Sequence, residues 1–325
     1  MTLPATVAVD VGGTKIRAGS VIDGELAHVR SVPTPATSGA QAVLDTIAEV
    51  TAAVVAEASG SHGGESAWRI GIGAAGVIDP ATGTVVSATD SLPGWAGTDL
   101  VTELSARSGL PVRVVNDVHA HALGEAAAGA SRGTRNSLLV AAGTGIGGGF
   151  ITDGHLLTGR NSAAGHVGHV PSAAASGLAC PCGGTGHVEA IASGPAILNT
   201  YRRLVDASDY PTSTPVAAPV PANTRELAAA ASAGDALAVR AFDIGARALG
   251  SALGGIANVL SPEAIVVGGG LAEMDETWWA PLREAFAAEL IPATSGTQLV
   301  KAELGQDAAL FGAASLWDDE PDERH

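Results

Sequence analysis

The sequence has few of the features that mark membrane, nucleic-acid-binding or secreted proteins. No stretch approaches the run of about 18 apolar residues that a membrane span requires. Lysine and arginine total 17 against 33 acidic residues, a net charge of −16, so no basic stripe is available to meet a phosphate backbone. The chain begins without a basic segment followed by an apolar one, which predicts a cytoplasmic protein without a signal peptide. No GxxxxGK[ST] run occurs, which argues against a P-loop nucleotide site.

The composition is that of a globular protein rich in turns. Apolar residues make up 46% of the 325 residues and charged residues 15%, which leaves room for two domains, each with a core. Aromatic residues reach only 3%, whereas there are 43 glycines without a Gly-X-Y period. This favours tight turns and loops whose backbone comes close to a ligand.

One pattern of strand, glycine turn, strand and Asp-Gly turn occurs twice, over residues 5–24 and again over 138–154. Such a repetition predicts an internal duplication, with two similar α/β domains and a phosphate-contacting glycine turn in each. Residues 39–58, 98–109 and about 118–129 are expected to be helices.

The glycine turns can bind phosphate, because adjacent glycines leave backbone N–H groups open to a ligand. Asp10, just before the first turn, can hold Mg²⁺ directly or through water. The alternative is an ordinary glycine hairpin. The second turn, Gly143 to Gly148, also matches the dinucleotide-binding fingerprint formally, but a strand follows where that fingerprint requires a helix. A phosphate-contacting β-turn therefore fits better.

Asn116 and Asp117 follow a short apolar strand and precede an alanine-rich helix. A carboxylate in this position can act as a general base toward an attacking hydroxyl. The alternative is that the pair caps the helix, since Asn and Asp are favoured N-cap residues. Both roles can coexist.

The only two cysteines, Cys180 and Cys182, lie close in sequence to His166, His169 and His187. A disulfide between such near neighbours would close almost no loop, whereas two thiolates and two imidazoles can bind Zn²⁺ tetrahedrally. Inert thiols with solvent-facing histidines are the alternative. Glu189 begins a helical run, where it can compensate the helix dipole or accept hydrogen bonds from vicinal hydroxyls of a sugar.

In this order and spacing, the motifs resemble those of the ROK family of sugar kinases and regulators over nearly the whole chain. The matching segments are Asp10 to Lys15, Gly143 to Gly149, Gly165 to His169 with Cys180 to Glu189, and Gly268 to Gly270. The resemblance implies an α/β fold of two actin-like (ribonuclease H-like) ATPase domains that face a central cleft. We expect residues 1–117, with a C-terminal helix at about 305–319, to form the first domain, and residues 118–304, with a zinc-type loop, to form the second.

The resemblance also implies a role for each motif, with ATP, Mg²⁺ and structural Zn²⁺ as cofactors. Asp117 is the expected catalytic base. Expected sugar contacts are Asn116, His166, His169 and Glu189, and we also expect the loop containing Ser91 near the sugar. Expected contacts to ATP are Asp10, Gly12, Gly13, Thr14, Lys15, Gly143, Thr144, Gly145, Gly268, Gly269 and Gly270. Expected zinc ligands are His169, Cys180, Cys182 and His187. A homodimer or homotetramer is implied, with no nucleic-acid or membrane partner.

Two residues depart from the pattern of most family members. His166 stands where most carry Glu, and it gives the Gly-His-x-Gly-His sequence of bacterial N-acetylmannosamine kinases. Replacing an acceptor-only carboxylate by an imidazole changes what is recognised there. We therefore predict ATP-dependent phosphorylation of N-acetylmannosamine at its C6 hydroxyl, a step of sialic acid catabolism. His187 stands where the family usually has a third zinc cysteine.

Three alternatives to that function remain: a glucokinase or other ROK hexose kinase, a ROK repressor that binds sugar and DNA, and an inactive sugar sensor. Because the first phosphate motif starts at Asp10, we expect no DNA-binding domain before it. An inactive sensor is disfavoured because Asp10, Asp117 and both glycine turns are present.

Overall fold

The computed structural model describes residues 5–62, 67–88, 92–207 and 221–318. They divide into two compact units. The first consists of Met1–Arg135, Gly149–Gly165 and Glu303–His325, and the second of Asn136–Gly148 and His166–Ala302. The first unit thus includes residues 118–135 and 149–165, which we had assigned to the second domain from sequence. A domain boundary after Asp117, which rests on the family resemblance, stays a prediction.

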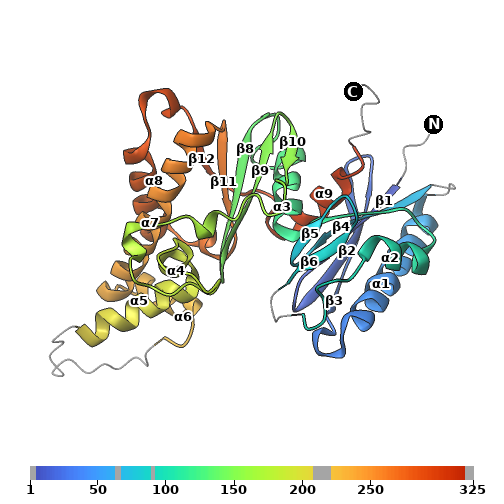
Figure 1. The fold of residues 1–325 in the computed structure, drawn as a ribbon, viewed down its shortest axis with the longest axis horizontal. Helices are drawn as coiled ribbons and strands as arrows, with labels where there is room; N and C mark the ends of the chain where they lie inside the picture. The colour runs from blue at the N-terminus through green and yellow to red at the C-terminus, as the bar shows by residue number, and fades with distance from the viewer. Residues whose placement is uncertain (1–4, 63–66, 89–91, 208–220, 319–325) are drawn as a thin grey trace. The chain divides into compact units, whose positions relative to one another are not determined.

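The first unit is built on a five-stranded sheet with the order β3-β2-β1-β4-β7 (Figure 1). Its central strand β1 pairs antiparallel with β2 and parallel with β4, and β4 pairs parallel with β7. The strands are β1 (Ala5–Val11), β2 (Lys15–Ile22), β3 (Glu25–Pro33), β4 (Trp68–Ala74) and β7 (Val112–Asn116), beside a separate hairpin of β5 (Val77–Asp79) and β6 (Thr84–Ser87).

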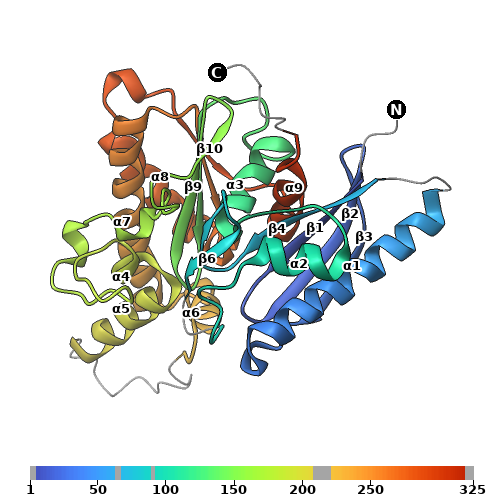
Figure 2. The same ribbon diagram turned by 45° about the vertical axis from the view of Figure 1, so that its right-hand side comes forward.

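Helices cover both faces of this sheet, which explains why apolar residues of β1 point to both faces. Val7 and Val9 belong to the same core cluster as Leu44 of α1, whereas Ala8, on the opposite face, packs with Leu310 of α9. This alternation follows from the two-residue repeat of a strand. Figure 2 shows α1 lying along β2 and β3. The helices of this unit are α1 (Ala40–His62), α2 (Leu100–Ser108), α3 (Asp117–Ala127) and α9 (Ala308–Ser315), with short 3₁₀ turns at η1 (Ala36–Ser38) and η6 (Gly305–Asp307).

The backbones of α3 and α9 are in direct contact. A Cβ atom at Gly124 would lie 1.9 Å from the carbonyl oxygen of Ala308, and one at Gly312 would lie 1.7 Å from that of Ala120. Only glycine allows this approach without moving the backbone. The C-terminal helix expected at about 305–319 therefore takes the form of η6 followed by α9.

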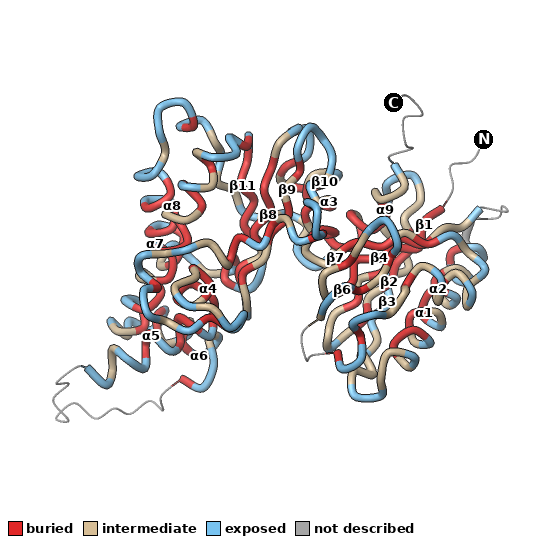
Figure 3. Tube along the Cα trace, viewed as in Figure 1, coloured by how far each residue is buried: buried red, intermediate tan, exposed pale blue. Residues whose placement is uncertain are grey.

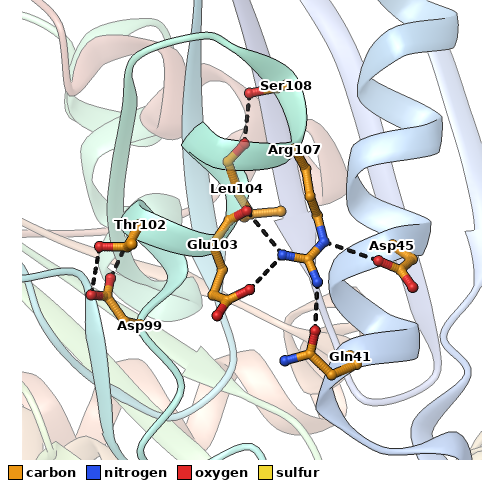
Figure 4. A network of polar contacts seen from close by, with 8 residues as sticks. All are labelled: Gln41, Asp45, Asp99, Thr102, Glu103, Leu104, Arg107 and Ser108. Atoms are coloured by element: carbon orange, nitrogen blue, oxygen red, sulfur yellow. Dashed lines mark hydrogen bonds and ion pairs between the residues drawn. The ribbon is translucent and has the colours of Figure 1, made fainter.

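A network around Arg107 joins α2 to α1 (Figure 4). Its guanidinium donates to Asp45 Oδ1 at 2.9 Å, to Gln41 Oε1 at 2.5 Å and to Glu103 Oε2 at 2.5 Å. A fourth acceptor is the backbone oxygen of Glu103 at 3.0 Å. Four acceptors around one planar group restrict its orientation, so this network fixes the position of α2 along α1.

The second five-stranded sheet has the order β10-β9-β8-β11-β12. When its strands are taken in chain order, this is the same arrangement as that of the first sheet, which is what an internal duplication predicts. Both Asp-Gly turns also have the same shape: φ is 51° and 79° at Asp23 and Gly24, and 52° and 86° at Asp153 and Gly154. Two positive φ angles are typical of a type I′ hairpin turn. The strands are β8 (Ser137–Ala142), β9 (Ile146–Thr152), β10 (His155–Leu157), β11 (Ala264–Gly268) and β12 (Gln298–Lys301).

Long helices complete the second unit. The helices α7 and α8 pack closely where Gly250 has no side chain, since a Cβ atom there would lie 2.3 Å from the carbonyl oxygen of Leu282. Figure 3 shows β8 and β11 among the buried segments. Among the described residues, no helix has the length and apolar character that a membrane crossing requires. The helices are α4 (Glu189–Ala192), α5 (Gly194–Ala207), α6 (Thr224–Ser232), α7 (Ala236–Leu260) and α8 (Glu276–Glu289), with 3₁₀ turns at η2 (Val167–His169), η3 (Ala173–Ala175), η4 (Gly270–Glu273) and η5 (Pro292–Thr294).

Candidate active site

Asn116 and Asp117 lie where β7 ends and α3 begins. The side-chain oxygen of Asn116 accepts from the N–H groups of Val118 at 2.9 Å and His119 at 3.2 Å, so Asn116 is the N-cap of α3. Its amide nitrogen donates to Asp117 Oδ1 at 2.8 Å and to the carbonyl oxygen of Gly76 at 2.7 Å. Both N–H donors of Asn116 are therefore engaged within the chain, and one of them orients the carboxylate of Asp117.

The sheet places Asp10 and Asp117 at the same edge. Asp10 pairs with Gly73 of β4, and the next residue of β4, Ala74, pairs with Asn116 of β7. A Cβ atom at Gly73 would lie 3.5 Å from the Cα atom of Asp117. Since β1, β4 and β7 are parallel, their carboxyl ends meet at one edge, which is where ligands bind in open α/β sheets.

Burial raises the pKa of the Asp117 carboxyl, and the negative charge of Asp10 adds to this effect. The backbone N–H of Val118 and the ring of His121 act in the opposite direction. Burial also raises the pKa of Asp10, opposed first by His121 and then by Arg17. A carboxyl whose pKa moves toward neutrality is a stronger base when it is ionised.

His121 is a neighbour of both carboxyls that our reading of the sequence missed. It lies one helical turn after Asp117, and its Nδ1 is 2.9 Å from the backbone oxygen of that residue. The sequence did contain a signal for this contact, because residues four apart in a helix lie side by side and His121 follows Asp117 by four.

The first glycine turn joins β1 to β2. It is closed by a hydrogen bond from Gly12 N–H to the carbonyl oxygen of Lys15 at 3.0 Å, and the hydroxyl of Thr34 donates to the carbonyl oxygen of Gly12 at 2.7 Å. Within the described part of the chain, the N–H groups of Gly13 and Thr14 donate to no other group. These two amides are thus available to an anion.

The side chains that follow this turn contact η6. Lys15 Nζ donates to Gln306 Oε1 at 2.6 Å, and Arg17 forms an ion pair of 2.6 Å with Asp307. The hydrogen bond to Gln306 uses one of the three N–H donors of the Lys15 ammonium, so the predicted phosphate contact from Lys15 stays compatible with it.

The second glycine turn follows β8. Gly143 N–H donates to the carbonyl oxygen of Gly145 at 2.9 Å, while the N–H groups of Thr144 and Gly145 make no hydrogen bond within the described ranges. The loop after β11 lies beside this turn, because a Cβ atom at Gly143 would be 3.8 Å from the backbone nitrogen of Gly270. Gly269 has a φ of 85°, and a Cβ atom there would lie 2.4 Å from the carbonyl oxygen of Ala142. Two of the predicted ATP motifs are therefore adjacent in the second unit.

The four predicted metal ligands come together. The candidate ligand atoms of His169, Cys180, Cys182 and His187 all lie within 4.8 Å of one another. Cys180 Sγ is 3.6 Å from His169 Nδ1, and Cys182 Sγ is 3.2 Å from His187 Nδ1. Ligands of a tetrahedral zinc ion are about 3.5 Å apart, given Zn–S and Zn–N bonds of about 2.3 and 2.0 Å. The donor set and its spacing thus fit zinc. Burial raises the pKa of the Cys180 thiol, and a bound zinc ion would favour its thiolate form.

Glu189 lies just after these ligands, at the start of α4, and only 8% of its surface is exposed. Its Oε2 accepts from the N–H of Ile146 at 2.7 Å, directly after the second glycine turn. His166 is exposed, with its ring centroid 6.0 Å from that of His169. Ser91 lies outside the described residues. Trp95 of the same loop is in the core and donates from Nε1 to the carbonyl oxygen of Ala75 at 3.0 Å.

The sequence profile of the ROK family matches residues 6–320. This chain belongs to the ROK family. A glucokinase of Halalkalibacterium halodurans is 35% identical over 320 residues, which cover 95% of this chain and 94% of that protein. An N-acetylmannosamine kinase of Citrobacter koseri is 31% identical over 313 residues, 96% of this chain and 98% of the relative. The crystal structure of a ROK family glucokinase from Streptomyces griseus in complex with glucose and AMPPNP has a TM-score of 0.76 and 35% identity, over 96% of this chain and 98% of that one. The family and the fold class predicted from the motifs are confirmed.

In this ROK protein each unit carries its own set of predicted site residues. The first holds Asp10, the turn Gly12 to Lys15, and Asn116 with Asp117. The second holds the turn Gly143 to Gly145, the loop Gly268 to Gly270, and the predicted metal ligands and sugar contacts between His166 and Glu189.

Proposed function

We propose that this ROK family protein transfers the γ-phosphoryl group of ATP to the C6 hydroxyl of a hexose, with Asp117 as general base. The observation that supports this best is the carboxylate of Asp117 at the carboxyl end of β7, oriented by Asn116 and with its pKa raised by burial. The kinases to which the chain is similar along nearly its whole length support the same reaction.

In the proposed reaction, Asp117 takes the proton of the C6 hydroxyl while the hydroxyl oxygen attacks the γ-phosphorus. The bond from the γ-phosphorus to the bridging oxygen breaks, and ADP leaves with the electron pair. ATP enters as its Mg²⁺ complex, and Asp10 is the proposed contact to that ion. The free amides of the two glycine turns are proposed to stabilise charge on the phosphoryl oxygens, and the loop Gly268 to Gly270 to contact the adenosine side.

Sugar contacts are proposed for His166, His169 and Glu189. Glu189 Oε2 is bound to Ile146 N–H, so we propose that Oε1, which has Cys180 Sγ at 3.9 Å, accepts from a sugar hydroxyl. The predicted contact from Asn116 would have to replace a hydrogen bond to Asp117 or Gly76. We favour orientation of Asp117 as the main role of Asn116.

We propose that His169, Cys180, Cys182 and His187 bind Zn²⁺ in a structural site. A tetrahedral zinc ion supplies cross-links between its ligands. The ligands come from η2 and from the loop before α4, so this site would tie together the two segments that carry His169 and Glu189. The proposed homodimer or homotetramer can be tested by light scattering.

The substrate that we propose is N-acetylmannosamine, on the basis of His166. Its imidazole can donate as well as accept a hydrogen bond, which suits an acetamido group better than a carboxylate does. Glucose is the second candidate, because the glucokinase relative is more similar to this chain, at 35% identity, than the N-acetylmannosamine kinase, at 31%.

A coupled ADP-release assay with N-acetylmannosamine, N-acetylglucosamine, glucose, mannose and fructose at equal concentrations tests the substrate. We expect the highest kcat/KM for N-acetylmannosamine, with the phosphate found on C6 by NMR of the product. In His166→Glu we expect the preference to move toward hexoses with a free 2-hydroxyl, whereas His155→Glu, an exposed control outside the site, should keep the wild-type ratio. An unchanged ratio in His166→Glu would place specificity elsewhere, and a wild-type preference for glucose would keep the kinase but contradict the role of His166.

A further inference from the structure

Both ends of the second glycine turn are held by one short segment, residues 189–194. At the start of the turn, Gly194 N–H donates to the carbonyl oxygen of Gly143 at 2.8 Å. At its end, Ile146 N–H donates to Glu189 Oε2 at 2.7 Å. The turn is therefore bound at two points, while the amides of Thr144 and Gly145 stay open between them.

The contact with Glu189 is close and shielded from water. Ile146 is 4% exposed and Glu189 8%, so an Ile146 N–H without this acceptor would have little access to solvent. A Cβ atom at Gly145 would lie 2.9 Å from Glu189 Oε2. The carboxylate thus packs directly against the turn, and a side chain at position 145 would have to displace it.

The backbone of Ile146 is also in contact, through its carbonyl group, with the segment that carries His169. A Cβ atom at Gly168 would lie 2.2 Å from the carbonyl oxygen of Ile146. Gly168 directly precedes His169, and Glu189 follows His187 by two residues. The backbone of Ile146 therefore lies between two segments that each contain a residue of the Cys/His cluster. Cys180 Sγ is itself 3.9 Å from Glu189 Oε1.

We propose that the Cys/His cluster, when it binds its metal, orders the glycine turn Gly143 to Gly145 for ATP, with Glu189 as the positioning residue. This rests on the proposed function, which makes that turn a phosphate contact. The cluster would then act on the nucleotide as well as on the sugar. Metal bound to His169 and His187 restrains the two segments, and Gly168, Glu189 and Gly194 transmit that restraint to the turn.

Binding of AMPPNP with Mg²⁺ and no sugar, measured by calorimetry, separates this effect from any sugar contact of Glu189. Metal-loaded and chelator-stripped protein are compared, with metal content measured in each sample. We expect stripping to weaken AMPPNP binding by about tenfold or more, in the usual range for coupling between sites. Hydrogen exchange over residues 143–149 should become faster in the stripped protein.

Three variants test the role of Glu189. Glu189→Ala should weaken AMPPNP binding with the metal still present, whereas Glu189→Gln keeps an oxygen that can accept from Ile146 and should bind AMPPNP nearly as wild type does. Glu284→Ala, an exposed acid of α8 in the same unit, is the matched control and should change nothing. If Glu189→Ala does not fold, the comparison of metal-loaded and stripped wild-type protein still tests whether the cluster affects AMPPNP binding.

Equal AMPPNP affinity and equal exchange in the loaded and stripped protein would overturn this proposal alone, since nucleotide would still bind. A chain that binds AMPPNP in neither state would contradict the proposed function, and this proposal with it.

Discussion

Glu125 is expected to hold the C-terminal helix in place, and its replacement should destabilise the first unit. Its side chain is fully buried in α3. It accepts from three backbone N–H groups, those of Ala130 at 2.8 Å, Glu303 at 3.2 Å and Leu304 at 2.9 Å. The last two belong to the segment that leads into α9. Glu125 therefore joins α3 to the start of the C-terminal segment.

The size of the effect follows from these three hydrogen bonds. Glu125→Ala removes all three acceptors, and each buried donor left without a partner costs about 1–3 kcal/mol. Glu303 is exposed, and Ala130 and Leu304 are half-buried, so water can reach part of the space. We therefore expect a total loss of about 2–5 kcal/mol of unfolding free energy, a large share of the roughly 5–15 kcal/mol that is typical of a protein domain. Glu125→Gln keeps one oxygen acceptor and should lose less.

Urea unfolding followed by circular dichroism measures this loss, and hydrogen exchange over residues 308–315 localises it to α9. Glu303→Ala is the control, because it removes an exposed side chain and leaves the backbone N–H in place. A loss below about 0.5 kcal/mol in Glu125→Ala, the range of ordinary surface substitutions, would refute the structural role of this carboxylate.

Three further predictions concern the same unit. Arg107→Met should lower the unfolding free energy by about 1 kcal/mol, because it breaks the network between α1 and α2 in Figure 4. The control is Arg240→Met, which removes a 63%-exposed arginine with one acidic partner and should change the unfolding free energy by less than about 0.5 kcal/mol. Equal losses in the two variants would contradict this prediction. Because burial raises the pKa of Asp117, turnover should fall as the pH drops through a value above the ordinary 3.8, which a pH profile of kcat/KM measures. The raised pKa favours the protonated form in the folded state, so this group's contribution to stability declines as the pH rises above 3.8. Asp117→Asn should accordingly melt at pH 7 no lower than the wild type, and a clearly lower melting temperature would contradict the sign.

Local features of this fold could be predicted from sequence because they depend on neighbouring residues. Apolar runs and Asp-Gly pairs marked β1, β2, β8 and β9, and the Asp-Gly turns have the positive φ angles that such pairs favour. The spacing of Cys180 and Cys182 with the nearby histidines also indicated the group that the structure brings together.

Contacts between residues far apart in the chain could not be predicted in this way. Glu125 lies 179 residues from Leu304, and Glu189 lies 43 residues from Ile146. Neither hydrogen bond leaves a periodic pattern, because a backbone N–H is the same in every residue type except proline. For the same reason the sequence could not show that both N–H donors of Asn116 are already engaged, since its partner Gly76 lies 40 residues earlier.

The most direct test of the proposed kinase compares wild type and Asp117→Asn in a coupled ADP-release assay with Mg·ATP and the preferred hexose. We predict hexose-dependent ADP release by the wild type. Asp117→Asn should keep its fold and its AMPPNP affinity but lose about 10²–10⁴-fold or more of turnover, because the base is gone. Near-normal turnover in that variant would contradict the role of Asp117, and no hexose-dependent ADP release by the wild type would contradict the proposed function itself.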